Sequence, residues 1–140
     1  MIRVPTRGLR TLAPLVFAAA AAACSNDNLT STVAPSPVQV TDTFAGTLTV
    51  NGGTTFQFLS TRGTVTATLS SVAPDSTIAV GMSLGTWNGA SCSAILSNDL
   101  AFLGAAIYGT VNATGTLCLR VYDVGKLADP LTFEVAVVHF

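Results

Sequence analysis

Apolar and polar residues alternate along most of the chain after residue 40. Threonine alternates with valine, alanine and leucine over residues 64–69, and apolar side chains occupy every second position over residues 116–122 and 131–137. A period of two is expected of a β-strand that buries one face and exposes the other. The pattern therefore predicts an all-β domain.

Glycine, asparagine, aspartate and proline interrupt this pattern at short intervals, and short strands between turns predict a sandwich or a barrel. Asn51-Gly52-Gly53 predicts a hairpin turn, because asparagine and glycine tolerate positive φ. Asn98-Asp99 and residues 125–130 predict longer connections. A short helix over 98–107 is the alternative for that segment, but its glycine disfavours it. We expect about eight strands, over residues 43–50, 54–60, 63–71, 77–84, 91–97, 101–111, 115–123 and 131–139.

The N-terminal residues differ from the rest of the chain. Three arginines lie within the first ten residues, an apolar run follows, and six alanines immediately precede Cys24. This order resembles a bacterial lipoprotein signal peptide with its lipobox. The resemblance implies that residues 1–23 are removed, that Cys24 is acylated and that the chain is anchored in a lipid bilayer. The alternative is a plain secreted protein that is cleaved near Ala23 and keeps Cys24 as an odd thiol.

By resemblance to enteric sorting rules, the serine that follows Cys24 favours the outer membrane over the inner one. Residues 24–40 then form the lipidated cysteine and a polar tether around Pro-Ser-Pro, a composition that cannot bury a core. Residues 41–140 are long enough for one folded domain. Without residues 1–23 the chain keeps three basic and seven acidic side chains, a net charge of −4. This balance excludes a nucleic-acid partner.

Four stretches of the folded part are similar to the bacterial pre-peptidase C-terminal domain: Phe44 to Phe58, Gly63 to Leu69, Pro74 to Thr77 and Gly115 to Asp123. The resemblance implies an antiparallel, jelly-roll-like β-sandwich that acts as an accessory or binding module. Some members of that family bind calcium through acids after the Pro-Asp turn. Asp75 is present here, but Thr77 and Ala79 stand where further acids would be needed, so no metal site is expected.

Two cysteines remain once Cys24 is acylated, and an envelope location allows them to pair. Cys118 alternates with inward-facing leucines, so its side chain is expected on the outer face of the strand over 115–123. Cys92 follows a turn at Asn88-Gly89-Ala90. We predict a disulfide bond that fastens residues 88–92 to that outer face, the alternative being two free thiols.

Residues suited to catalysis are few. His139, the one histidine, lies at the end of the last strand on the face of Val135 and Val137, and Glu134 is the one glutamate. No Gly-x-Ser-x-Gly motif and no phosphate-binding glycine loop occur. The sequence therefore predicts that the protein is not an enzyme and holds no cofactor.

The candidate ligand contacts are Trp87 and Asn88, in a segment where a strand runs into a loop. An exposed tryptophan can stack on a sugar or anchor a protein contact, and the alternative is a tryptophan that caps one end of the sandwich. We therefore expect a non-catalytic, lipid-anchored envelope protein that binds a protein or a glycan. The alternative is a structural module that self-associates, for instance through the apolar stretch from Ala101 to Tyr108. A hydrolase is a distant third.

Overall fold

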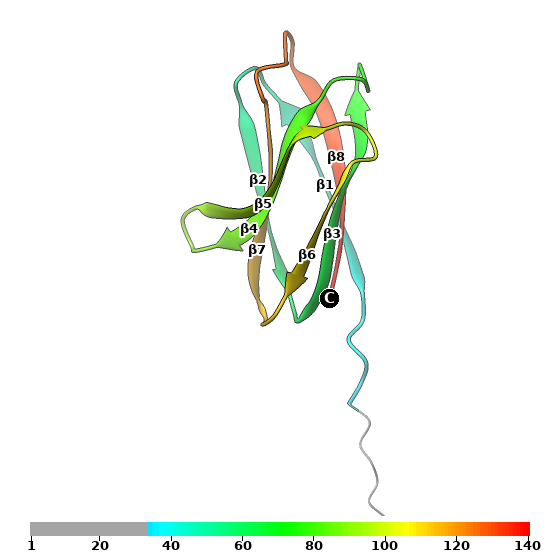
Figure 1. Cartoon of the computed structure of the whole chain (residues 1–140), viewed down its shortest axis with the longest axis vertical. Coiled ribbons are helices and arrows are strands. Elements are labelled where there is room, and N and C mark those ends of the chain that lie inside the picture. The colour runs from blue at the N-terminus through cyan, green and yellow to red at the C-terminus, as the bar shows by residue number, and fades with distance from the viewer. Residues whose placement is uncertain (1–33) are drawn as a thin grey trace, which may run out of the picture. The chain divides into compact units, whose positions relative to one another are not determined.

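The computed structural model describes residues 34–140, and within them eight strands pair in a nested order (Figure 1). The first strand pairs with the last, the second with the seventh, the third with the sixth and the fourth with the fifth, all antiparallel. The first and second halves of the chain thus form one long antiparallel ladder, which begins at the β4–β5 turn and is rolled up. The strands are β1 (Val40–Leu48), β2 (Gly53–Ser60), β3 (Gly63–Ala73), β4 (Val80–Trp87), β5 (Cys92–Ala101), β6 (Ala106–Val111), β7 (Gly115–Tyr122) and β8 (Leu131–His139).

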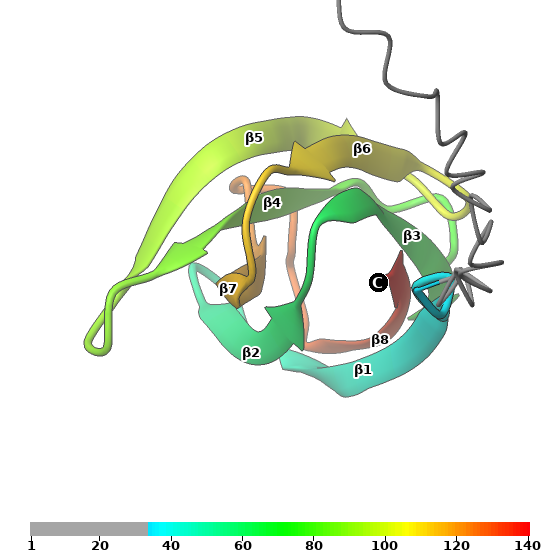
Figure 2. The same ribbon diagram turned by 90° about the horizontal axis from the view of Figure 1, so that it is seen from below.

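The rolled ladder forms two four-stranded antiparallel sheets, ordered β1-β8-β3-β6 and β2-β7-β4-β5. The two sheets face each other across the core (Figure 2). The predicted all-β, jelly-roll-like sandwich is confirmed, including the number of strands. Residues 35–140 form one compact unit.

The alternation seen in the sequence becomes the alternation of buried and exposed faces. In β8 every second residue from Leu131 to His139 is buried, as expected for a strand with one face on the core. Four phenylalanines from β1, β2 and β8 pack together, with the rings of Phe44 and Phe56 stacked at 5.0 Å between centroids. Such pairs stabilise a core beyond the area that they bury.

The turn at Asn51 differs from the prediction. Its φ of 56° agrees with the expected positive value, but β1 and β2 belong to different sheets and do not form a hairpin. The turn instead carries the chain from one sheet to the other. At this turn the carboxylate of Asp123 accepts a hydrogen bond from the Asn51 N–H at 2.8 Å. Turn chemistry specifies a local reversal, and the sheet in which the next strand pairs depends on distant residues.

The prediction of a connection at Asn98-Asp99 is wrong, and the strand predicted over 101–111 is confirmed only for residues 106–111, which form β6. Asn98 and Asp99 lie inside β5, whose register against β4 shifts near Asn98. The side chain of Asn98 accepts a hydrogen bond from the Leu100 N–H at 2.9 Å, so it supports a bulge and not a turn. The reversal falls at Phe102–Ala105, where Gly104 has a φ of 85° and Ala105 N–H donates to the Phe102 carbonyl at 2.8 Å.

The predicted signal peptide and Cys24 lie outside the described residues. Within residues 34–140, no helix is long and apolar enough to cross a membrane. The acylation of Cys24 and the domain limits derived from it stay predictions.

Candidate functional site

The end of the β4–β5 hairpin, residues 87–92, projects sideways from the sandwich as an arm (Figures 1 and 2). Trp87, the last residue of β4, lies at its base and is half-buried, while Asn88 to Ser91 are exposed. The sequence placed Trp87 and Asn88 where a strand runs into a loop, and the structure has them at that point. The arm is therefore the part of the described domain that reaches farthest into solvent beside the sheets.

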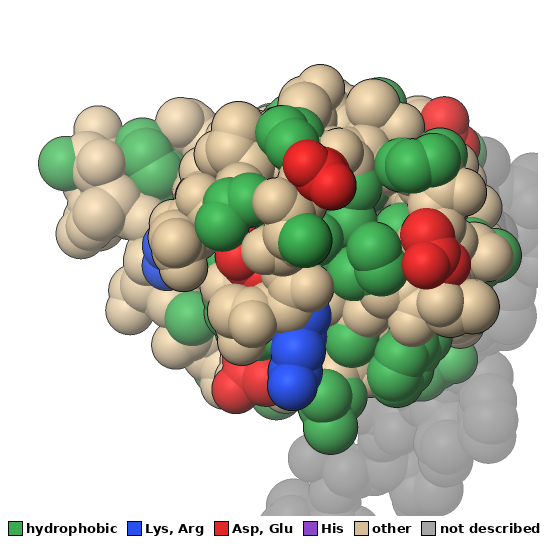
Figure 3. Space-filling view, turned by 90° about the horizontal axis from the view of Figure 1, so that it is seen from above, with side chains coloured by type: hydrophobic (Ala, Val, Ile, Leu, Met, Phe, Trp, Pro, Cys, Tyr) green, Lys and Arg blue, Asp and Glu red, His purple; other side chains and the backbone are tan. Residues whose placement is uncertain are grey.

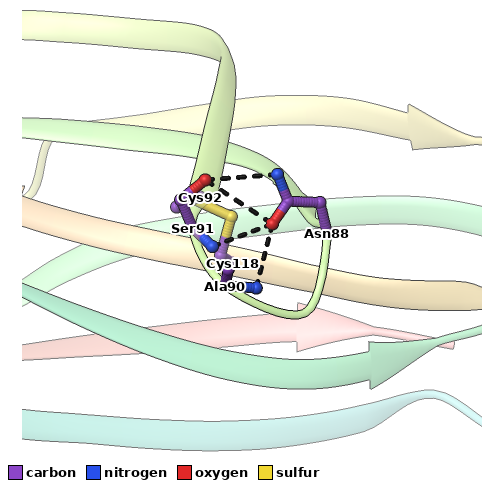
Figure 4. The surroundings of a disulfide bond; sticks show 5 residues. All are labelled: Asn88, Ala90, Ser91, Cys92 and Cys118. Atoms are coloured by element: carbon purple, nitrogen blue, oxygen red, sulfur yellow. Dashed lines mark hydrogen bonds between the residues drawn. A yellow bond between two sulfur atoms is a disulfide. The ribbon is translucent and has the colours of Figure 1, made fainter.

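The side chain of Asn88 organises the tip of the arm (Figure 4). Its Oδ1 accepts hydrogen bonds from the N–H groups of Ala90 and Ser91 at 2.9 and 2.8 Å, and its Nδ2 donates to Ser91 Oγ at 3.2 Å. Gly89 adopts a φ of 97°, a value that favours glycine. These contacts within the loop hold the exposed backbone in one conformation.

A disulfide bond joins the arm to β7, one of the two inner strands of its sheet. Cys92, the first residue of β5, is bonded to Cys118 of β7, with their Cα atoms 5.8 Å apart (Figure 4). Cys118 is fully buried, although it lies on the outer face of β7, because the bent end of the β4–β5 hairpin covers it. The arm thus leaves the sheet edge, turns back and is fastened to the sheet two strands away.

Small residues in β4 make room for this fastening. Its outer face carries Gly81, Ser83 and Gly85, all buried. A Cβ atom at Gly85 would lie 2.0 Å from the Ser93 carbonyl oxygen, and one at Gly81 would lie 2.2 Å from the Tyr122 ring. Only glycine allows β5 and the side chains of β7 to pass so close over β4.

A second contact fastens the other end of β5. The hydroxyl of Tyr122 in β7 donates a hydrogen bond to the carboxylate of Asp99 in β5, spanning β4 above Gly81. Partial burial raises the pKa of Tyr122 to about 12, and the hydrogen bond to Asp99 acts in the same direction. The Arg120 guanidinium lies 5.3 Å from the centre of the Tyr122 ring. The disulfide bond and this hydrogen bond therefore hold β5 at its two ends.

An uncharged groove separates β5 from β6, which are the edge strands of the two sheets on the same side of the sandwich. Val65, Ile95, Leu96, Gly109 and Thr110 line two adjoining hollows in it, of about 350 and 590 Å³. The smaller hollow extends to the β6–β7 loop and the larger one to Tyr108. We call this feature the β5–β6 groove.

The residues weighed for catalysis and metal binding have structural partners. His139 is buried, its Nε2 lies 3.0 Å from a carboxylate oxygen of Asp42, and its ring lies 5.1 Å from that of Phe58. Asp75 accepts hydrogen bonds from the hydroxyl and the N–H of Thr77, which lower its pKa. Within residues 34–140, no three histidine, cysteine or acidic side chains are grouped closely enough to hold a metal ion.

Asp123 also has a structural role, as an acceptor of backbone hydrogen bonds. Partial burial raises its pKa, but four backbone N–H groups, from Asn51, Lys126, Leu127 and Gly125, outweigh this effect and hold the pKa below its usual value. Its carboxylate thus joins the start of the β7–β8 loop to the β1–β2 turn. This end of the sandwich also exposes apolar side chains between separate acidic groups (Figure 3).

Sequence reasoning missed the glycines beneath the arm and the contact between Asp99 and Tyr122. A signal for the glycines was present, because Gly81, Ser83 and Gly85 occupy alternate positions of one strand. Small residues along one strand face indicate that another part of the chain approaches closely there. No local pattern indicated the contact between Asp99 and Tyr122, which lie 23 residues apart.

No protein-family model matches the chain, and no curated protein sequence does. Among solved structures, the chain is similar to the periplasmic lysozyme inhibitor of g-type lysozyme, PliG, from Aeromonas hydrophila. The TM-score is 0.51 and the identity 17%, over 71% of this chain and 86% of that one. The likeness is one of fold. The resemblance to the pre-peptidase C-terminal domain stays a prediction, while the β-sandwich that it implied is present.

Proposed function

We propose that this chain is a non-catalytic, lipid-anchored protein of the bacterial outer membrane whose β-sandwich binds another protein through the arm. The location rests on the lipoprotein-like N-terminus, and a disulfide bond suits an oxidising compartment. The fold is shared with a periplasmic inhibitor protein, which supports a binding role in the envelope.

The observation that carries the proposal is the bracing of the projecting arm. A loop that must be ordered on binding loses conformational entropy, and this loss weakens the complex. Here the disulfide bond and the hydrogen bonds of Asn88 order the loop beforehand. A narrow, rigid projection with a tryptophan at its base suits insertion into a concave site on a partner.

PliG is described as an inhibitor of g-type lysozyme, so we propose a peptidoglycan-cleaving enzyme of that kind as the partner. Binding sites for substrates are concave as a rule, and an enzyme that cleaves a polymer must hold that polymer in such a site. An arm seated in that site would exclude the substrate without any reaction. The chemistry of the arm fits this role, because residues 87–92 carry hydrogen-bonding and apolar groups and no charge.

The test measures the lysis of peptidoglycan by a g-type lysozyme with increasing amounts of the protein, together with the affinity of the complex by calorimetry. We expect inhibition, and we expect Trp87→Ala to weaken binding by a factor of about ten or more, as for an aromatic anchor at an interface. Val50→Ala, at an exposed site in another loop, serves as the matched control and should bind like the wild type.

Absence of both inhibition and binding would remove this enzyme as the partner. Equal affinity of the wild type and Trp87→Ala would remove the arm as the contact surface. Binding to soluble peptidoglycan fragments without the enzyme would show that the ligand is a glycan.

A further inference from the structure

The side of the domain formed by β5 and β6 is almost free of charge. Between residues 76 and 119 the one charged side chain is Asp99, and its carboxylate is engaged by the Tyr122 hydroxyl. The described residues as a whole carry three basic and six acidic side chains, so the domain is net negative. The acids and the three cations therefore lie almost entirely on other parts of the surface.

This neutral side also exposes large apolar side chains. Of the large hydrophobic residues that are exposed in the described chain, six of ten fall between residues 95 and 108. β5 is exposed along both faces for most of its length, and Ile95 is 68% exposed. Exposed apolar side chains that gather on two strands and the turn between them mark an interaction site more often than isolated ones do.

A projection and a hollow lie next to each other on this surface. Tyr108 of β6 is 73% exposed and stands at the rim of the larger hollow of the β5–β6 groove, about 590 Å³ in volume. Thr64, Thr66 and Gly109 line that hollow along with apolar groups of β5. The Gly109 position keeps the groove open, since a Cβ there would lie 3.2 Å from the Leu96 side chain.

We propose that two copies of the chain associate through this surface about a twofold axis, with Tyr108 of each copy in the β5–β6 groove of the other. A surface that carries both a projection and the hollow that receives it is self-complementary, which is what a twofold interface requires. Two net-negative domains also repel each other least where their touching faces carry no charge.

In the proposed dimer, side chains make the contact, and the strands of one copy do not pair with the strands of the other. The register of β5 shifts at two places along its pairing with β4. Bulges of this kind bend an edge strand and hinder pairing with a strand of another molecule. The unpaired edges of β5 and β6 thus border the interface without extending a sheet through it.

The experiment is sedimentation equilibrium of the full chain in a density-matched detergent, which gives the mass of the protein alone. We expect the wild type to reach twice the monomer mass with rising concentration. Tyr108→Asp places a charge in the uncharged groove and should raise the dissociation constant by a factor of about ten or more. Leu59→Asp is the matched control, because Leu59 is 63% exposed on β2, outside the proposed interface.

A wild type that stays monomeric at all concentrations would overturn the proposal. Dimers that Tyr108→Asp leaves intact, or that Leu59→Asp weakens equally, would overturn it too. Trp87→Ala should dimerise like the wild type, which separates this surface from the arm. Circular dichroism melting of each variant establishes that the fold is retained, as expected for Tyr108 and Leu59, which are exposed.

Discussion

At the scale of single residues, the arm depends on two glycines of β4 that carry no side chain. Gly81 and Gly85 leave the outer face of β4 bare, so that the Ser93 carbonyl and the Tyr122 ring can lie against it. The bridge between Cys92 and Cys118 uses the space that this bare face provides.

We predict that Gly85→Ala destabilises the protein by about 3 kcal/mol, because its Cβ would overlap the backbone of Ser93, which cannot yield like a flexible side chain. Urea denaturation measures the free energy of unfolding. Gly115→Ala is the control, since a Cβ there meets nothing within 4 Å, and it should change stability little. Equal stability of both variants would mean that β5 does not lie against β4 as described.

The Tyr122 hydroxyl gives a prediction for alkaline pH. The folded protein keeps this proton up to a pKa of about 12, whereas an unfolded chain releases it near 10. The folded state therefore binds more protons over this window, and stability that is complete below pH 10 declines as the pH rises towards 12.

Thermal melting across that window should show a shallower decline for Tyr122→Phe than for the wild type. Asp99→Asn keeps a hydrogen-bond acceptor but removes the charge, and it should give an intermediate slope. A Tyr122→Phe variant with the wild-type slope would exclude Tyr122 as the group that titrates.

The sequence predicted some of these residues and not others, for a physical reason. Strand parity placed Cys118 on the outer face of its strand, because side-chain direction follows from local backbone alone. The sequence could not show that this outer face is buried at Cys118, since the cover comes from the β4–β5 hairpin folding back. The contact between Asp99 and Tyr122 depends on the same fold-back and was invisible for the same reason.

At the scale of elements, β5 is the unusual strand. It is ten residues long, its register shifts twice, and it is held to β7 at both ends by contacts that pass over β4. Its polar pair Asn98-Asp99 looks like a turn in the sequence, because turns and bulges favour the same residue types. The strands with one buried face, such as β8, followed the predicted alternation closely.

We predict that the double variant Cys92→Ser, Cys118→Ser folds but is less stable by about 3.5 kcal/mol, the chain-entropy effect of opening a loop with a sequence separation of 26 residues. Hydrogen exchange should accelerate most at residues 86–94, where the arm loses its fastening. Reduction of the wild type should reproduce both effects. Unchanged exchange in the arm would show that the loop hydrogen bonds alone brace it.

At the scale of the whole molecule, the sequence predicted the class of fold but not its connections. Periodicity and turn residues were enough for an antiparallel sandwich of about eight strands, because burial of one strand face is a local property. The nested pairing that puts β1 beside β8 is a long-range property, and the turn at Asn51 therefore joins two sheets instead of two neighbours in one. The arm and the β5–β6 groove both follow from that nesting.

The nested strand pairing also places the two proposed binding surfaces, the arm and the β5–β6 groove, at different parts of the domain. The arm lies at the β4–β5 end of the paired strands, and the β5–β6 groove lies between the edge strands of the two sheets. The first strand, β1, begins beside the C-terminal end of β8. A chain anchored through its N-terminal segment could therefore present the arm and the groove to different partners.

The anchor and the braced arm can both be tested by the intact mass of the protein from its native membrane fraction. The mass is measured before and after reduction, for the wild type and for Cys24→Ala. We expect a chain that begins at Cys24 with added acyl mass, and a gain of about two daltons on reduction as the Cys92–Cys118 bond opens. Cys24→Ala should lack the acyl mass and keep the gain. An unacylated wild-type chain would contradict the anchor, and an unchanged mass on reduction would contradict the braced arm.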